Sequence, residues 1–369
     1  MLRAAGHRVS VEIVSNAELC GLPSQGRAFL RAAFDPEMAK WVTDLVRGDE
    51  VEVVHVHNFF PLLTPAVHEG AARAGAAVVQ TLHNYRLLCA NGLFLRNGRV
   101  CEKCLNGPKS WGLVHRCYRG SLPASVAVTR MQMRAARMGT WQRNVHRFIA
   151  LTPFAREKFV AGGLPRSRIS VKPNFVSALP PQRGRAPRGA LYVGRLSMEK
   201  GVRVLLNAWR ELPEIPLTII GDGPERSALQ ASAPPNVTFR GALPGAVVRE
   251  QMEAAACLIV PSIWYEGFPM TVVEAFAAGL PVIASRIGSL TDIVEDGKTG
   301  RLFAAGDPLA LTQVVREYFS QGQHVKLSAA ARMEYESRFT PQINLAELTA
   351  IYDGAIAEAC EFVVSSERR

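Results

Sequence analysis

Two glutamates, separated by seven residues, lie where a buried strand is expected to lead through a loop into a helix. Glu266 stands in the loop beside Gly267, and Glu274 falls within the helix that is expected to start at Pro269. Free N–H groups at a helix N-terminus attract phosphate, and glycine lets a ligand approach the backbone closely. Carboxylates accept hydrogen bonds from vicinal hydroxyls. The stretch 261–285 therefore predicts a site for an anionic ligand with hydroxyl groups; the alternative is a solvated loop glutamate and a buried, paired one.

A second group of polar residues follows the apolar run 190–193 and precedes a helix that is expected to reach Leu212. It consists of Gly194, Arg195 and Lys200 in the string Gly-Arg-Leu-Ser-Met-Glu-Lys-Gly. A strand, a glycine-containing turn and a helix form a phosphate-type loop, although the P-loop pattern is absent. Arg195 can fork onto a phosphate and Lys200 supplies a mobile point charge, whereas as surface residues alone they are unremarkable.

Two histidines lie at the ends of expected strands. Residues 51–56 lead into His57-Asn58, and residues 76–82 lead into His83-Asn84. Ligands of open α/β sheets collect at the carboxyl ends of strands, which makes both pairs candidates for a site. The alternative is that each histidine is a satisfied structural residue.

Four cysteines gather within a short stretch: Cys89, Cys101, Cys104 and Cys117. Two of them have the C-x-x-C spacing of a structural zinc site, and His115 is a substitute ligand. Four protein ligands leave no open position, so such a zinc ion would be structural. Two alternatives to a zinc site remain open. The thiols are free or buried in an inserted loop, or two of them form a disulfide.

An arginine-rich amphipathic stretch is expected at 122–141. Spacings of four and three place Arg130, Arg134 and Arg137 on one face. The face is either simply solvated or docks on an anionic membrane surface.

Composition sets the broad class. The chain has 369 residues, which suggests two domains, and a net charge of +11 with a pI near 9.6, which points to a polyanionic partner. No apolar run reaches the roughly 18 residues of a membrane span, and the first residues lack the apolar core of a signal peptide. Seven cysteines suit a reducing compartment. We therefore expect a cytoplasmic protein.

Strands and helices alternate in both halves of the chain, which predicts two doubly wound parallel sheets of the α/β class that face a cleft. A helix tail is expected at 2–6 and a strand at 8–14. The predicted domains are an N-terminal domain (1–176, with a cysteine-rich insertion at about 89–117), a proline- and arginine-containing linker (177–188), a C-terminal domain (189–344) and a C-terminal helix (345–369).

Strings in three parts of the chain together resemble one known family. They are Glu-Gly-Phe-Pro, Glu-Ala and Gly-Leu-Pro-Val-Ile-Ala-Ser within 261–285; Gly-Arg-Leu-x-x-x-Lys-Gly at 194–201; and Thr-Leu-His-Asn-Tyr-Arg-Leu-Leu-Cys at 81–89. The chain resembles the retaining family-4 glycosyltransferases (group 1), which have the GT-B fold of two Rossmann-like domains. The resemblance covers nearly all of the chain.

The resemblance implies a role for each candidate. Glu266 would contact the donor sugar, Glu274 the ribose, and Arg195 with Lys200 the diphosphate, while His83 would border the reacting sugar and the acceptor. The implied catalytic residues are thus His83, Glu266, Arg195 and Lys200. The implied donor site comprises Gly194, Arg195, Lys200, Gly221, Glu266, Gly267, Phe268, Pro269, Met270, Thr271 and Glu274, and the acceptor side His57, Asn58, His83 and Asn84.

The implied reaction is transfer of a sugar from a UDP- or GDP-linked donor to a hydroxyl with retention. The acceptor would be a polysaccharide or lipid-linked molecule, and no divalent metal would be obligatory. The C-terminal helix would pack back on the N-terminal domain, and the enzyme would be cytoplasmic or peripheral on the inner face of the plasma membrane.

The chain departs from the family at its start. Members begin with a strand and a glycine-rich loop beside the donor phosphates, whereas this chain begins at what resembles the following helix. We expect either a longer protein with an upstream start or a weakened, inactive form.

Two other functions are alternatives to this one. The first is a non-catalytic remnant that binds sugar nucleotides. The second is a zinc-stabilised nucleic-acid-binding protein, which the dispersed basic residues and the lack of an aromatic-interleaved basic motif disfavour, so no nucleic-acid partner is expected.

Overall fold

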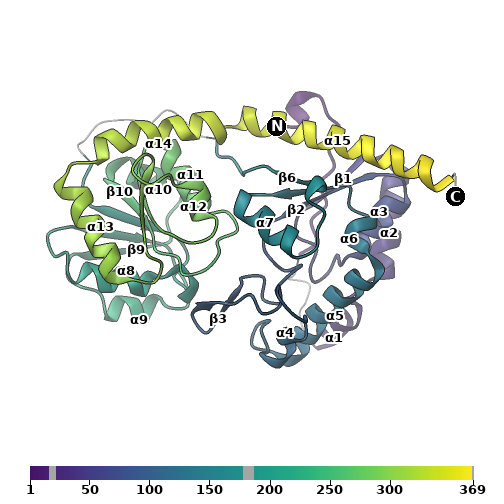
Figure 1. Ribbon diagram of the computed structural model, residues 1–369, viewed down its shortest axis with the longest axis horizontal. Coiled ribbons are helices and arrows are strands. Elements are labelled where there is room, and N and C mark those ends of the chain that lie inside the picture. The colour runs from purple at the N-terminus through teal and green to yellow at the C-terminus, as the bar shows by residue number, and fades with distance from the viewer. Residues whose placement is uncertain (16–21, 178–186, 368–369) are drawn as a thin grey trace. The chain divides into compact units, whose positions relative to one another are not determined.

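The computed structural model describes residues 1–15, 22–177 and 187–367. Its elements group into two compact units, labelled along the chain in Figure 1. The first unit comprises Met1–Phe94, Cys101–Lys172 and Leu345–Arg369, and the second comprises Leu95–Val100 and Pro173–Asn344. Most of the predicted linker, residues 178–186, lies outside the described residues.

The first unit contains a parallel sheet in the order β1-β2-β5-β6. Every residue of β2 is buried, as expected for an inner strand of a parallel sheet that is covered on both faces. The strands are β1 (Val53–Val56), β2 (Ala77–Leu82), β5 (Arg147–Ala150) and β6 (Ile169–Val171).

Helices of the first unit begin where the sequence offers a cap. Asp35 caps α2 by accepting a hydrogen bond from the Glu37 amide, and Pro36 occupies the first helical position. α2 and α3 pack closely at Gly70, where a Cβ would overlap the carbonyl oxygen of Ala39. The helices are α1 (Leu22–Arg31), α2 (Pro36–Gly48), α3 (Ala66–Arg73), α4 (Trp111–Val114), α5 (Leu122–Met138), α6 (Thr140–Arg143) and α7 (Pro153–Ala161).

The long C-terminal helix α15 (Pro341–Glu367) enters the first unit at Leu345. Its apolar residues Leu348, Ile351 and Ala355 pack in one buried cluster with residues of β2 and β5. The helix therefore supplies one wall of the first unit's core.

One predicted strand of the first unit is wrong, and two predicted helical segments differ in extent or type. Residues 8–14 form no strand: Val11 and Ile13 are 65% and 84% exposed, so the alternating pattern has no buried face to stabilise it. The predicted helix at 122–141 is interrupted at Gly139, which adopts a left-handed conformation with φ of 63° and caps α5. The expected helix tail at 2–6 is a short 3₁₀ turn, Arg3–Ala5, that ends at Gly6.

The second unit contains a six-stranded parallel sheet in the order β12-β11-β10-β7-β8-β9. Together with the first sheet it confirms the predicted α/β class. The strands are β7 (Ala190–Val193), β8 (Leu217–Ile220), β9 (Val237–Gly241), β10 (Cys257–Val260), β11 (Val282–Ser285) and β12 (Gly300–Phe303).

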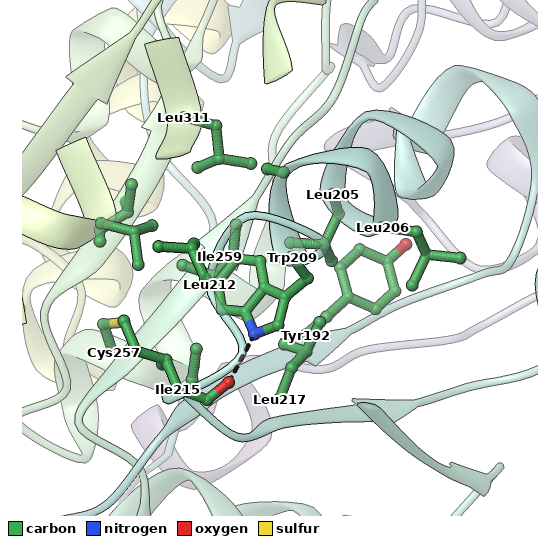
Figure 2. Packing of buried hydrophobic residues seen from close by; sticks show 14 of the residues in the cluster. Tyr192, Leu205, Leu206, Trp209, Leu212, Ile215, Leu217, Cys257, Ile259 and Leu311 are labelled. Carbon is green, nitrogen blue, oxygen red and sulfur yellow. Dashed lines mark hydrogen bonds between the residues drawn. The ribbon is translucent and has the colours of Figure 1, made fainter. Parts of the chain in front are cut away.

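Helices cover both faces of this sheet. Alternate residues of β7 belong to two different buried clusters, Tyr192 to one and Leu191 to the other. Figure 2 shows the first cluster around Trp209, whose indole N–H donates to the Ile215 carbonyl at 2.9 Å. The helices are α8 (Val202–Trp209), α9 (Arg226–Ala231), α10 (Gly245–Ala254), α11 (Met270–Ala277), α12 (Leu290–Ile293), α13 (Pro308–Ser320) and α14 (His324–Arg338).

Sequence patterns missed α1, α14 and a small antiparallel hairpin of β3 (Leu95–Arg96) and β4 (Arg99–Val100) inside the cysteine-rich insertion. Among the described residues, none of the helices combines the length and the apolar character that crossing a membrane requires.

Candidate functional site

The strand order of the second sheet marks one position for a ligand. From β7 the chain adds β8 and β9 on one side, and from β10 it adds β11 and β12 on the other. β7 and β10 are therefore neighbours at the point where the strand order reverses, and ligands of such sheets bind beyond the carboxyl ends of those strands. The loops that leave these two strands, 194–201 and 261–269, contain most of the predicted donor-site residues.

Close backbone approaches hold these loops together. Gly201 has a φ of 69°, and a Cβ there would overlap the carbonyl oxygen of Pro261, so the loops after β7 and β10 touch at this glycine. The Ile263 amide donates to the Glu199 carbonyl at 3.0 Å and links the same two loops. Gly221 after β8 lies against the Gly194 carbonyl in a similar way. The site is therefore built on a fixed backbone.

An ion pair joins the two loops at the centre of this region. The Lys200 ammonium lies 2.8 and 3.0 Å from the two carboxylate oxygens of Glu266, and the Ser262 hydroxyl donates to the same carboxylate at 2.6 Å. Glu266 is only 4% exposed. The structure thus brings together Lys200, which the resemblance places at the diphosphate, and Glu266, which it places at the donor sugar.

Arg195 lies two residues beyond β7 and is exposed. Its carbonyl oxygen accepts a hydrogen bond of 2.9 Å from the Tyr192 hydroxyl, which fixes the backbone. In the described part of the chain its guanidinium has no carboxylate within ion-pair distance. It is therefore available to an anionic ligand.

Glu274 lies one turn inside α11 and is half-buried. Burial raises the pKa of its carboxyl, and no basic side chain of the described residues pairs with it. A partly buried, unpaired carboxyl is a candidate for binding hydroxyl groups. The remaining predicted donor residues surround the start of the same helix: Gly267, Phe268, Pro269, Met270 and Thr271, with Pro269 as the N-cap.

In the first unit, the predicted histidines at the ends of β1 and β2 form a pair. His57 Nδ1 and His83 Nε2 are 2.8 Å apart, so one ring donates an N–H to the other. Asn84 donates to the Asn58 side chain at 3.5 Å. Desolvation lowers the pKa of His57, and that of His83 to about 4, so both rings are neutral at pH 7.

Sequence patterns missed His55, the third histidine of this cluster. Its ring stacks on His57 with 4.3 Å between centroids, and its nitrogens lie 2.8 Å from the Tyr352 hydroxyl and 2.7 Å from the Thr81 hydroxyl. The string His-Val-His carried the signal, because residues two apart in a strand share a face. Burial lowers the pKa of His55 to about 3, and its ring contacts link His57, Tyr352 and Thr81.

Lys172, one residue beyond β6, was also missed. It is 7% exposed, and burial lowers the pKa of its ammonium to about 8. Its charge acts on His57 and His83 and lowers the pKa of both rings further. The carboxyl end of the first sheet therefore combines neutral imidazoles with a buried amine.

The four cysteines of the insertion are free of disulfides. Burial raises the pKa of the Cys89 and Cys104 thiols, and Cys104 is close enough to Cys89 and Cys101 for their charges to interact. Within the described residues, no three His, Cys, Asp or Glu side chains are placed to hold a metal ion. The structural zinc site at Cys89, Cys101, Cys104 and Cys117 thus stays a prediction that metal analysis of the purified protein decides.

The three arginines on α5 are not equivalent. Arg134 pairs with Glu69 at 2.8 Å and stacks on Phe34, whereas Arg130 and Arg137 are exposed. Arg130 lies over the Phe29 ring at 6.0 Å, and neither it nor Arg137 has a carboxylate partner among the described residues.

Comparison with known proteins identifies the family. The model of "Glycosyl transferases group 1" matches residues 187–321, and that of "Glycosyl transferase 4-like domain" matches residues 1–174. The chain is 32% identical over 221 residues to a GDP-mannose-dependent alpha-mannosyltransferase of Mycobacterium tuberculosis. The matched stretch covers 54% of this chain and 57% of that protein. Over 122 residues the chain is 36% identical to the sulfoquinovosyl transferase SQD2 of Arabidopsis thaliana, 32% of this chain and 24% of that one. The chain thus spans little more than half the length of these relatives, or less.

Solved structures share the fold at low sequence identity. HepE of Anabaena in complex with UDP superposes with a TM-score of 0.65 at 18% identity, over 86% of this chain and 84% of that one. The sucrose-phosphate synthase of Thermosynechococcus elongatus superposes with a TM-score of 0.66 at 17% identity, over 90% and 80%. Because two glycosyltransferase models span most of the sequence and the fold agrees, the chain belongs to the group 1 glycosyltransferases of the family 4 type, with the GT-B fold.

Proposed function

We propose that this protein transfers a sugar, with retention of configuration, from a UDP- or GDP-linked donor to an acceptor hydroxyl. The observation that carries the proposal is the convergence of Arg195, Lys200 and Glu266 at the reversal point of the second sheet, next to the start of α11. The names of the relatives support a nucleotide-sugar donor, since one is GDP-mannose-dependent and HepE was solved with UDP. A lipopolysaccharide galactosyltransferase of Salmonella typhimurium is a further relative and supports a surface polysaccharide or glycolipid product.

The chemical step is departure of a nucleoside diphosphate, on which negative charge develops. Arg195, Lys200 and the N–H groups at the start of α11 are the positive groups at this place, and preorganised charges of this kind lower the barrier by electrostatics. Lys200 contacts Glu266. Binding of the diphosphate would give the ammonium a second anion, while Glu266 would accept hydrogen bonds from the sugar hydroxyls and Glu274 from the ribose.

The acceptor side would be formed by the His57–His83 pair. Because one ring donates to the other and both are neutral, a ring nitrogen remains free to accept the proton of an acceptor hydroxyl. Because side chains supply the positive charge that stabilises the leaving diphosphate, the proposed reaction requires no divalent cation. We therefore expect the enzyme to stay active in EDTA. A cytoplasmic location, peripheral on the inner face of the plasma membrane, is part of the proposal, with Arg130 and Arg137 of α5 as its basic groups.

The test is a panel of UDP- and GDP-sugars, scored by thermal shift for binding and by diphosphate release for turnover. Release from at least one donor, lost on replacement of Arg195 by Gln, is the expected result. Binding without release from any donor, with a range of sugar acceptors present, would instead support the non-catalytic remnant. The absence of binding to every donor would refute the assignment of Glu266 and Glu274.

A further inference from the structure

One arginine in the first unit lacks the partner that a partly buried cation normally has. The Arg86 guanidinium carbon lies 4.9 Å from the ring centre of Tyr118 and 5.6 Å from that of Phe60, so two aromatic rings contact it. Its Nε is buried without a hydrogen-bond partner, and across the described residues no carboxylate is within ion-pair distance. Its Nη1 donates a hydrogen bond of 3.5 Å to the Tyr118 hydroxyl. Stacking on aromatic rings and one neutral hydroxyl offset part of the desolvation of a cation, but they do not supply the anion that a guanidinium fork can bind.

Hydrogen bonds hold the backbone from which this side chain extends. The Arg86 amide donates to Asn84 Oδ1 at 3.0 Å, and the Gln132 side chain donates to the Arg86 carbonyl at 2.6 Å. Gly92 leaves room beside the guanidinium, since a Cβ there would lie 3.4 Å from Arg86 Nη2. With the backbone fixed and the guanidinium held against the Phe60 and Tyr118 rings, the arginine is preorganised, which reduces the entropy lost on binding a ligand.

Arg86 lines a cavity in the first unit together with both residues of the histidine pair and with Asn58 and Asn84. The cavity has a volume of about 40 Å³. One water requires roughly 10–15 Å³ on this measure, so the space suits about three water-sized groups, which is the size of a small oxyanion.

The charges around the cavity favour an anion. Arg86 is positive, His57 and His83 are neutral, and Lys172 is close enough for its charge to act on both rings. The acidic group that acts on Lys172 is Glu347, whereas none of the cavity-lining residues is acidic. Asn58 and Asn84 add amide donors for an oxyanion.

We propose that Arg86, with His83 and the amides of Asn58 and Asn84, binds an oxyanion group, phosphate or carboxylate, that the acceptor carries close to its reacting hydroxyl. The site would thereby select acidic acceptors, such as sugar phosphates or uronic acids, over neutral ones. This inference rests on the proposed function, because that function makes the His83 side the acceptor side.

The experiment titrates the full chain with inorganic phosphate and, separately, with acetate, at constant ionic strength. The measurement is the ring ¹H–¹³C signals of His57 and His83 in NMR spectra, assigned by single substitutions. An anion bound beside a neutral imidazole stabilises its protonated form, so both signals should shift in a saturable way and the pKa of each ring should rise. Repeating the titration with saturating UDP and with saturating GDP separates the acceptor side from the donor diphosphate.

The variants are Arg86→Gln, Arg86→Lys and the control Arg119→Gln. Arg119 also lies over the Tyr118 ring, at 5.4 Å, but it is exposed and does not line the cavity. We expect a dissociation constant at least about tenfold higher for Arg86→Gln, since a charge-assisted hydrogen bond is lost, and an intermediate value for Arg86→Lys. Arg119→Gln should titrate as the wild type does, and Arg86→Lys tests the inference even if Arg86→Gln fails to fold.

Two results would overturn the inference. If Arg86→Gln and wild type respond alike, or if neither signal shifts with phosphate or with acetate, the cavity holds an adventitious ion only or none. If bound UDP or GDP abolishes the response, the oxyanion belongs to the donor. Diphosphate release from nucleotide sugars is measured on the same samples, so failure of the proposed function is seen separately from failure of the Arg86 site.

Discussion

Replacing Lys200 by methionine should both destabilise the protein and slow turnover, and the two effects can be separated. The Glu266 carboxylate is 4% exposed and receives two contacts from Lys200 and one hydrogen bond from Ser262. Without Lys200 it would be a nearly buried charge with one hydroxyl donor. Removing one partner of a fully buried pair costs about 3–5 kcal/mol.

The cost of removing Lys200 should be smaller than this, because its side chain is 27% exposed and solvent screens the pair. We therefore expect the free energy of unfolding in urea to fall by about 1–3 kcal/mol. Lys298→Met is the matched control: Lys298 lies 2.7 Å from a Glu295 carboxylate oxygen, but both side chains are about 60% exposed. That variant should unfold as the wild type does.

The double variant Lys200→Met/Glu266→Gln distinguishes pairing from catalysis. Replacing both charges removes the uncompensated carboxylate, so stability should return to within about 1 kcal/mol of the wild type. Turnover should not return, because the double variant lacks both the Lys200 charge at the leaving diphosphate, whose loss lowers kcat about 10²–10³-fold, and the Glu266 carboxylate proposed to contact the donor sugar. Diphosphate release measures this. If the double variant regained wild-type turnover, Lys200 would serve only to pair with Glu266 and the electrostatic role would be refuted.

Three further outcomes follow from the same structure. Glu274→Gln should weaken binding of the cognate nucleoside diphosphate about tenfold in calorimetry. The loss should be much smaller for the 2′- or 3′-deoxy nucleotide that lacks the hydroxyl to which the carboxylate binds. Gly201→Ala should lower the free energy of unfolding by more than about 2 kcal/mol, since a Cβ would overlap the Pro261 carbonyl, whereas Gly297→Ala, at a similar positive φ but with open space, should cost only about 1 kcal/mol. Lys172 has a lowered pKa of about 8 in the folded state against 10.5 when unfolded, so the unfolded state binds more protons between these values and stability should rise with pH there, by about 3 kcal/mol for this group. Lys172→Met should flatten that rise in urea unfolding measured from pH 7.5 to 10.5, and an unchanged slope would contradict the burial argument.

The second unit was the easier half to predict from sequence. Its strands are short apolar runs that end directly in glycine- and proline-containing loops, so the strings at 190–201 and 257–285 specify strand, loop and helix locally. These strings do not reveal that β7 and β10 are neighbours, because that depends on the order of all six strands. The contact between Lys200 and Glu266, 66 positions apart, follows from that order and could not be predicted from either string alone.

In the first unit, the residues that sequence patterns missed depend on long-range packing. His55 contacts Tyr352, 297 positions away on α15, and Lys172 follows β6, whose place next to β5 depends on pairing between separate segments. Conversely, the alternating residues at 8–14 have the pattern of a strand, but none of the described strands pairs with them and they stay exposed. Alternation predicts a strand only when a buried face is available, which local sequence does not reveal.

The pairing of individual cations is more informative than the chain's net charge. Lys and Arg together number 43 against 32 for Asp and Glu, which by itself fits any polyanionic partner. Some arginines have acids beside them, as Arg134 has Glu69 and Arg166 has Glu157, whereas the exposed Arg130 and Arg137 of α5 have none among the described residues. Arg195 and Arg86 also lack an acid partner there, but they differ in place, because they closely follow the strands β7 and β2. Cations left unpaired at the carboxyl ends of parallel strands are placed to meet a small anionic ligand in one orientation, whereas a nucleic-acid surface needs a row of them along one face.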